Sequence, residues 1–321
     1  MMHLCRNSTM NSETTIAALY HFTKNPLGDL AKVQSELLQL GRDHAIKGTL
    51  LLAAEGINGT IAGSQDDIHL LIEAIETHLK IDKLSWKQSH ATKNPFYRWK
   101  VKIKKEIVTL GQNSKQVASK TGRYVAAKDW NALINDPDVV LVDTRNDYET
   151  AIGKFPEAID PKTKNFRDFP TFVSNHLVNS KDKKIAMYCT GGIRCEKASN
   201  YLIEQGFENV YQLRGGVLQY FEDNDSDENL WQGECFVFDN RVSVNKKLEK
   251  GQYDQCYGCR SAITEEDKKH RHYEPGVSCH HCYDSTSQTQ KKRFQERQYQ
   301  QTIAKKRGQS HIGRKQINET A

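Results

Sequence analysis

Two short apolar runs most constrain the fold of this chain. The first is VVLVD at 139–143, and the second is KIAMY at 184–188, which ends directly before Cys189. Apolar runs of this kind are typical of parallel strands that are buried on both faces. Helix-like segments separate them, and NVYQLRGGVLQYF at 209–221 adds a strand, a Gly-Gly turn and a helix start. The alternation predicts a parallel α/β domain over 111–230, with Cys189 at the carboxyl end of a strand.

The segment before this domain has a different order of elements. Strand-like TTIAALYHF is followed by a helical pattern, by two strands around the turn in EGING, and by a second helical pattern. Strand-like KLSWKQS and WKVKIKKEIVTL complete the segment. The order β-α-β-β-α-β predicts a ferredoxin-like α+β domain over 1–110.

The last region, 231–321, holds five of the eight cysteines, four of them in two Cys-x-x-Cys pairs, and a basic tail. GECFVFDNRVSV is typical of a hairpin, which we expect to turn at Asp239 and Asn240. The sequence after the cysteines is polar nearly all round, which favours an exposed helix or a disordered tail. The fold class is therefore mixed: an α+β domain, a parallel α/β domain and a small Cys-rich C-terminal region.

The loop CTGGIRC at 189–195 combines a thiol, two glycines and an arginine before a helix. A thiol reacts as the thiolate, and a helix N-terminus with successive free N–H groups lowers the thiol pKa. We predict Cys189 and Arg194 as the catalytic residues. Cys195 is either a resolving thiol or a core residue, and the sequence leaves both open. The rest of the predicted active-site loop consists of Thr190, Gly191, Gly192, Ile193 and Cys195.

Two Cys-x-x-Cys pairs lie nineteen residues apart in the C-terminal region. This spacing is typical of a structural zinc site with four thiolate ligands. Free thiols, or disulfides formed on oxidation, are the alternatives. Since four thiolates leave no open coordination position, zinc here would stabilise the fold of the tail. The predicted metal ligands are Cys256, Cys259, Cys279 and Cys282.

The net charge of +6 is unevenly distributed. Residues 83–105 hold eight Lys and Arg without an acid, and residues 285–321 hold nine against two Glu. Such basic segments on an otherwise acidic chain favour a polyanionic partner, and aromatic residues beside Arg and Lys can stack on unpaired bases. Strand alternation would place Val101 and Ile103 opposite the lysines of this segment. The predicted RNA-binding residues are Arg98, Trp99, Lys100, Lys102 and Lys104.

The location of the protein is predicted from what its sequence contains. No apolar run approaches the roughly 20 residues of a membrane helix, and MMHLCRNSTMNSE lacks the apolar core of a secretory signal. Cysteines in metal-type spacing fit a reducing compartment. We therefore expect a cytoplasmic protein without a membrane partner; its oligomeric state is not predicted.

Three motifs resemble, in order, the signatures of a rhodanese domain: VVLVDTRNDYE, MYCTGGIRC and VYQLRGGVLQYF. The six-residue loop CTGGIR is similar to that of sulfur-transferring rhodaneses. Related phosphatases have a loop one residue longer, which disfavours phosphatase activity. GKFPEAIDP departs from the usual Gly-His-Ile-x-Gly-Ala, because Lys154 and Glu157 replace the His and the Gly.

Nearly the whole chain resembles the tRNA uridine-34 5-hydroxylase family, through LLLAAEGINGTIAG, CTGGIRCEKAS, CFVFDNRV and GQYDQCYGCR. The resemblance implies a tRNA-modifying oxidoreductase that hydroxylates the wobble uridine with molecular oxygen. It also implies that Cys189 is the essential, persulfide-type cysteine. The alternatives are a persulfide sulfurtransferase acting on a small molecule, a protein or tRNA, and a zinc-containing RNA-binding protein.

The residues do not identify the cofactor that would activate oxygen. The chain has no Gly-x-Gly-x-x-Gly flavin fingerprint. HYE at 272–274 matches one part of an iron-binding triad, but a match of this length is expected by chance among twelve histidines.

Overall fold

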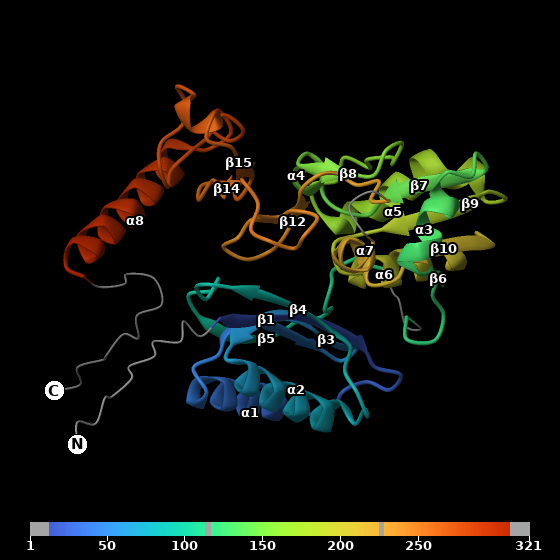
Figure 1. Ribbon diagram of the computed structural model, residues 1–321, viewed down its shortest axis with the longest axis horizontal. Coiled ribbons are helices and arrows are strands. Elements are labelled where there is room, and N and C mark those ends of the chain that lie inside the picture. The colour runs from blue at the N-terminus through green and yellow to red at the C-terminus, as the bar shows by residue number, and fades with distance from the viewer. Residues whose placement is uncertain (1–12, 113–116, 225–227, 309–321) are drawn as a thin grey trace, which may run out of the picture.

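The computed structural model describes residues 13–112, 117–224 and 228–308. They form an N-terminal domain, a central domain and a C-terminal region (Figure 1). The last residues of the basic tail lie outside the described residues. Among the described residues, no helix is long and apolar enough to cross a bilayer. The cytoplasmic location stays a prediction.

The N-terminal domain is a five-stranded sheet with two helices on one face (Figure 1). The strand order is β4-β1-β3-β2-β5, with β5 parallel to β2 at the edge and the other pairs antiparallel. The predicted ferredoxin-like fold is confirmed, with β5 as an added strand. Its elements are β1 (Thr14–Phe22), α1 (Leu30–Asp43), β2 (Lys47–Ala53), β3 (Gly56–Gly63), α2 (Gln65–Leu79), β4 (Trp86–Ala91) and β5 (Trp99–Ile103).

Strand alternation gives this sheet one core face and one open face. Ala17 and Leu19 of β1 pack into the core under the helices. Ala18 and Tyr20, which alternate with them, therefore face away from the helices. Figure 1 shows that the face without helices is turned toward the central domain and the C-terminal region. The open face of this sheet thus forms one side of the space between the N-terminal domain and the rest of the protein.

The central domain is a parallel sheet in the order β6-β10-β9-β7, which confirms the predicted parallel architecture. Its two apolar strands are largely buried, as the sequence indicates. The strands are β6 (Arg123–Val125), β7 (Val139–Asp143), β8 (Gly153–Lys154), β9 (Lys184–Tyr188) and β10 (Asn209–Leu213). The helices are α3 (Ala127–Ile134), α4 (Asp147–Thr150), η1 (Phe166–Asp168), α5 (Phe169–Phe172), η2 (Val173–Leu177), η3 (Val178–Ser180), α6 (Ile193–Glu204) and α7 (Gly216–Asp223).

The C-terminal region contains short strand pairs and one long helix. The predicted hairpin is present as β12 and β13, with Asp239 and Asn240 in its connection. The predicted exposed helix is present as α8, in which no residue is buried. The elements are β11 (Gln232–Gly233), β12 (Cys235–Phe236), β13 (Ser243–Val244), β14 (Asp254–Gln255), β15 (Ala262–Ile263), η4 (Asp267–Lys269) and α8 (Gln288–Lys306).

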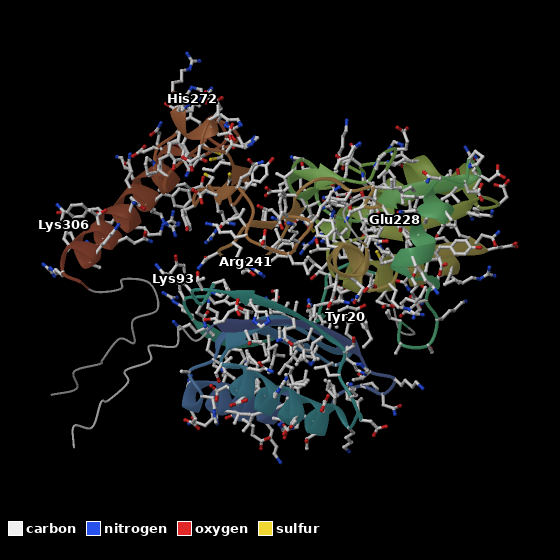
Figure 2. All side chains as sticks on the ribbon, in the orientation of Figure 1. Tyr20, Lys93, Glu228, Arg241, His272 and Lys306 are labelled. Atoms are coloured by element: carbon white, nitrogen blue, oxygen red, sulfur yellow. The ribbon has the colours of Figure 1, made fainter. Side chains whose placement is uncertain are left out.

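The hairpin connection joins this region to the N-terminal domain. Asn240 donates its backbone N–H to the carbonyl of Pro95 at 3.1 Å, and Arg241 donates to Ser89 Oγ of β4 at 2.9 Å. Arg241 lies between the hairpin and the sheet (Figure 2). Asp239 holds the Arg241 guanidinium from the other side, with an Oδ2–Nη2 distance of 2.7 Å.

A buried ion cluster fixes the central domain against the N-terminal domain. Lys197 of α6 has a side chain that is 1% exposed, and its Nζ lies 2.9 Å from Glu55 Oε1 and 2.6 Å from Glu106 Oε2. Glu55 comes from the turn between β2 and β3, and its carboxylate also accepts the N–H of Ile107. Helix α6 is thereby attached to the other domain within its second turn.

We expect Lys197→Ala to lower the free energy of unfolding by about 3 kcal/mol, because it leaves two partly buried carboxylates without their cation. Urea denaturation followed by tryptophan fluorescence measures this loss. Lys269→Ala is the matched control, since Lys269 pairs with Glu266 in solvent with a side chain that is 72% exposed. A loss no larger than that of the control would contradict the structural role of Lys197.

Candidate active site and metal centre

Cys189 lies where the sequence predicts, directly after β9 and four residues before α6 begins. Its Sγ accepts the backbone N–H of Gly192 at 3.1 Å. Gly192 has φ +102°, and a Cβ there would lie 2.8 Å from the Tyr20 hydroxyl oxygen. Glycine is therefore required at this position, both by the backbone and by the N-terminal domain above it.

The surroundings of Cys189 favour its thiolate. Burial alone would raise the thiol pKa, but hydrogen bonding from Cys195, the charge of Arg194 and the backbone N–H groups lower it to about 6. A large part of the Cys189 side chain population is therefore the thiolate at neutral pH. The thiolate is the state that attacks electrophiles, including the sulfane sulfur of a donor, which gives a persulfide and releases the rest of the donor.

Arg194 is held by a carboxylate that the sequence analysis did not single out. Glu149 is fully buried, and its two oxygens accept from Arg194 at 2.6 and 2.7 Å. The same carboxylate accepts from Thr190 Oγ1 at 3.3 Å. Glu149 thus fixes the guanidinium beside the loop. Its only sequence signal is its position in RNDYE, where it also accepts the N–H of Asn146 in a capping box.

Cys195 lies in the core below the loop, with its Sγ 3.5 Å from Thr144 Oγ1. Burial raises its pKa well above the ordinary thiol value, so it stays protonated and donates to Cys189. This buried position agrees with the interpretation of Cys195 as a core residue. Its contact with Cys189 would also allow a resolving role, which stays a prediction.

Glu196 forms a second unpredicted contact at the loop. Its carboxylate accepts from Tyr20 of the N-terminal domain at 3.0 Å and from Tyr124 at 2.9 Å. Burial raises the pKa of Glu196, although both tyrosines counteract this by hydrogen bonding. The pair Tyr20–Glu196 joins the two domains at the edge of the Cys189 loop. No local pattern could reveal it, because 176 residues separate the partners.

A cavity of about 1220 Å³ lies between the open sheet face and the Cys189 loop. Tyr20 points from the N-terminal sheet toward the central domain (Figure 2). A cavity of this size holds a ligand as large as a nucleotide. The lining comes from all three parts of the chain and includes Cys189, Arg194, Glu196, Tyr20, Lys87 and Phe238.

The predicted RNA-binding residues lie at and beyond β5. Arg98, Lys100 and Lys102 are exposed, and Lys104 lines the active-site cavity. Val101, predicted on the face opposite the lysines, is buried. Ile103, predicted on the same face as Val101, is 42% exposed at the end of β5, which is an edge strand.

Trp99 is placed against α1 and not in the open. Its indole N–H points at the carbonyls of Leu37 and Leu38, at 3.3 and 3.2 Å, and its ring packs on Gly41. This half-buried position is that of a packing residue, which is the more common fate of a tryptophan. Tyr97, by contrast, is 48% exposed.

The four predicted metal ligands converge. Their Sγ atoms lie within 4.8 Å of one another, and they are the only such group among the described residues. Three of the pairs are 3.8, 3.9 and 4.0 Å apart, close to the roughly 3.8 Å between thiolates around one tetrahedral zinc. The donor set therefore fits a metal ion such as zinc, held by Cys256, Cys259, Cys279 and Cys282.

The comparisons with known proteins agree with this architecture. Residues 126–223 match the rhodanese-like domain family, so the protein is a rhodanese-domain protein with cysteine-based chemistry. Residues 14–107 match the UPF0176 acylphosphatase-like domain. The two domains together, in this order, are the domain architecture of the UPF0176 family.

Solved structures resemble one domain each. A rhodanese-like domain from Anabaena is 21% identical, covering 34% of this chain and 78% of its own, with a TM-score of 0.29. A rhodanese-like domain protein from Staphylococcus aureus is 26% identical, covering 32% and 93%, with a TM-score of 0.25. An acylphosphatase from Coxiella burnetii is 10% identical, covering 30% and 98%, with a TM-score of 0.22.

The lowered pKa of Cys189 predicts how the reactivity of its thiol depends on pH. Because the pKa is lowered from 9.0 to about 6, the rate of iodoacetamide labelling should rise through about pH 6 and level off above it. Arg194→Ala should move this midpoint upward, since a cation near the thiolate is lost. Peptide mass spectrometry at Cys189 gives the rates. A wild-type midpoint near 9 would contradict the activated thiol.

The cysteine cluster predicts about one zinc ion per chain. Cys256→Ser and Cys279→Ser should each remove it and lower the thermal stability of the C-terminal region, while Cys235→Ser serves as a matched control because Cys235 lies outside the cluster. Elemental analysis of protein purified without chelator measures the metal. Absence of zinc and of any other metal would overturn the metal site.

Proposed function

We propose that the protein hydroxylates the wobble uridine of tRNA to 5-hydroxyuridine. The observation that carries the proposal is the position of the Cys189 thiolate, in the wall of a nucleotide-sized cavity between the rhodanese-like domain and the UPF0176 domain. In the reaction, the C5–H bond of uracil becomes C5–OH. One atom of molecular oxygen enters the base and the other leaves as water, so a reductant must supply two electrons and two protons.

RNA fits this cavity better than a small uncharged substrate does, because cations in its wall could bind phosphates. Four acidic residues also line the cavity: Glu106, Glu196, Glu222 and Asp239. Lys87, Lys104 and Arg214 line it beside the loop. Lys87 reaches Gly215, where an added Cβ would lie 2.7 Å from its Nζ. Such cations can receive the phosphates on either side of an unpaired base. The wobble base lies in a single-stranded loop, so it can enter the cavity without the cost of breaking a base pair.

The residues of the chain have separate roles in this proposal. Gly192 N–H and Cys195 stabilise the sulfur of Cys189 as an anion, and Glu149 holds Arg194 beside it. Tyr20 covers the loop from the N-terminal side and excludes water. Cys189 would carry the reactive sulfur, as a thiolate or persulfide.

A persulfide sulfurtransferase is the second candidate, and the loop itself favours it. Six residues from Cys189 to Arg194, with an N–H group directed at Sγ, are suited to hold a persulfide anion. The product distinguishes the two candidates, because one adds oxygen to a nucleoside and the other adds sulfur to its acceptor.

Mass spectrometry of bulk tRNA nucleosides tests the proposal. A deletion strain should lose 5-hydroxyuridine and its derivatives, and a gene copy encoding Cys189→Ser should not restore them. The same variant should keep its tRNA affinity, since the phosphate contacts are elsewhere, which separates chemistry from binding. Loss of a thiolated nucleoside would favour the sulfurtransferase. Unchanged nucleosides would contradict both.

A further inference from the structure

A second, smaller cavity of about 270 Å³ lies beside the active-site cavity. Phe238, in the connection between β12 and β13, lines both of them. The other walls come from the segment before β5, from α4 and from the residues next to β14. The two cavities therefore share one aromatic wall, and the smaller cavity is adjacent to the place where Cys189 would meet its substrate.

The walls of the small cavity are aromatic, and two of them are exposed. Phe238 is 59% exposed and Tyr97 is 48% exposed. Behind them, Phe236 holds the ring of Phe238 edge to face at 5.3 Å and that of Tyr148 at 5.2 Å. An exposed aromatic ring that is held in place by a buried one is typical of a binding surface.

One cation lines the small cavity, and others follow Tyr97, which also lines it, along the chain. Arg260 lines the small cavity and follows Cys259 in the metal cluster. Lys100 comes from β5, and its pKa is lowered by burial and by the nearby charges of Lys102, Arg98 and Arg260. None of these cations forms an ion pair with a carboxylate elsewhere in the described part of the chain. Asp239 also lines the small cavity, but it is paired with Arg241. The nearby cations therefore keep their positive charge, as in sites that bind phosphates.

Arg260 also has an unusual backbone. Its φ of +77° lies in the left-handed region, where glycine is the residue without strain. A long cationic side chain at such a position costs stability, so a functional role for the side chain is the simpler explanation. Gln255 holds the guanidinium, accepting from it at 3.0 Å.

We propose that the small cavity binds the nucleobase next to the target uridine, in the same single-stranded RNA. Tyr97 and Phe238 would stack on that base, while Arg98, Lys100 and Arg260 bind the adjoining phosphates. Stacking accepts any base, so this site positions the strand and contributes little sequence preference. The inference rests on the proposed function, because it assigns the target uridine to the neighbouring cavity.

The test uses the full-length protein and a tRNA anticodon stem-loop that carries 2-aminopurine next to the wobble uridine. Stacking on an aromatic ring quenches 2-aminopurine, so binding of wild-type protein should quench its fluorescence. Tyr97→Ala should remove most of the quenching and weaken binding about ten-fold. Arg260→Gln should weaken binding and flatten its dependence on salt. Tyr299→Ala is the control, because Tyr299 is 61% exposed on α8 and lines neither cavity.

A second probe places 2-aminopurine in the stem, where neither Tyr97→Ala nor Arg260→Gln should alter its fluorescence. Equal quenching and affinity in wild type, Tyr97→Ala and Phe238→Ala would overturn the pocket, and so would a stem-loop that binds without quenching. Nucleoside analysis reads the proposed function separately. If quenching depends on Tyr97 but no hydroxylated uridine forms, the pocket stands and the proposed reaction falls. If the uridine is hydroxylated by Tyr97→Ala at the wild-type rate and affinity, the reaction stands and the pocket falls.

Discussion

The site depends on the ion pairs of the buried Lys197 with Glu55 and Glu106. These pairs attach helix α6 to the N-terminal domain, and the same helix carries Arg194 and Glu196. Burying three charged groups contributes little net stability, since each loses its hydration. What the cluster supplies is a fixed relation between two domains that otherwise meet across a large cavity.

Buried charges are also paired around the Cys189 sulfur. Arg194 contributes a cation to Cys189, yet Glu149 compensates that cation on its other side, so the buried group has nearly balanced charge. The lowered pKa of Cys189 therefore depends on short-range donors, the thiol of Cys195 and the loop N–H groups, together with Arg194. Such donors keep their geometry when a substrate enters, whereas a flexible exposed cation would not.

The sequence was sufficient where the signal is local. Apolar runs predict the parallel strands, the spacing of glycines predicts the loop of Cys189, and two Cys-x-x-Cys pairs predict the convergence of four thiols. It was insufficient where a role depends on distant partners. Glu149 meets Arg194 from 45 residues away, and Phe238 looks like any hairpin residue until the N-terminal sheet is placed opposite. Trp99 shows the reverse: a basic, aromatic context indicated RNA, but Gly41 leaves room on α1 for its ring.

The shared wall has a consequence for how the protein is made. A ribosome delivers Tyr20 first, the Cys189 loop next and Phe238 only afterwards, and domains fold as they emerge. The Cys189 loop is thus made before the wall formed by Phe238. A chain that ended just before Phe238 would lack part of the wall of the active-site cavity, because Phe238, Asp239 and Arg241 line it. The C-terminal region therefore completes the cavity in front of a cysteine loop that the earlier parts of the chain have already built.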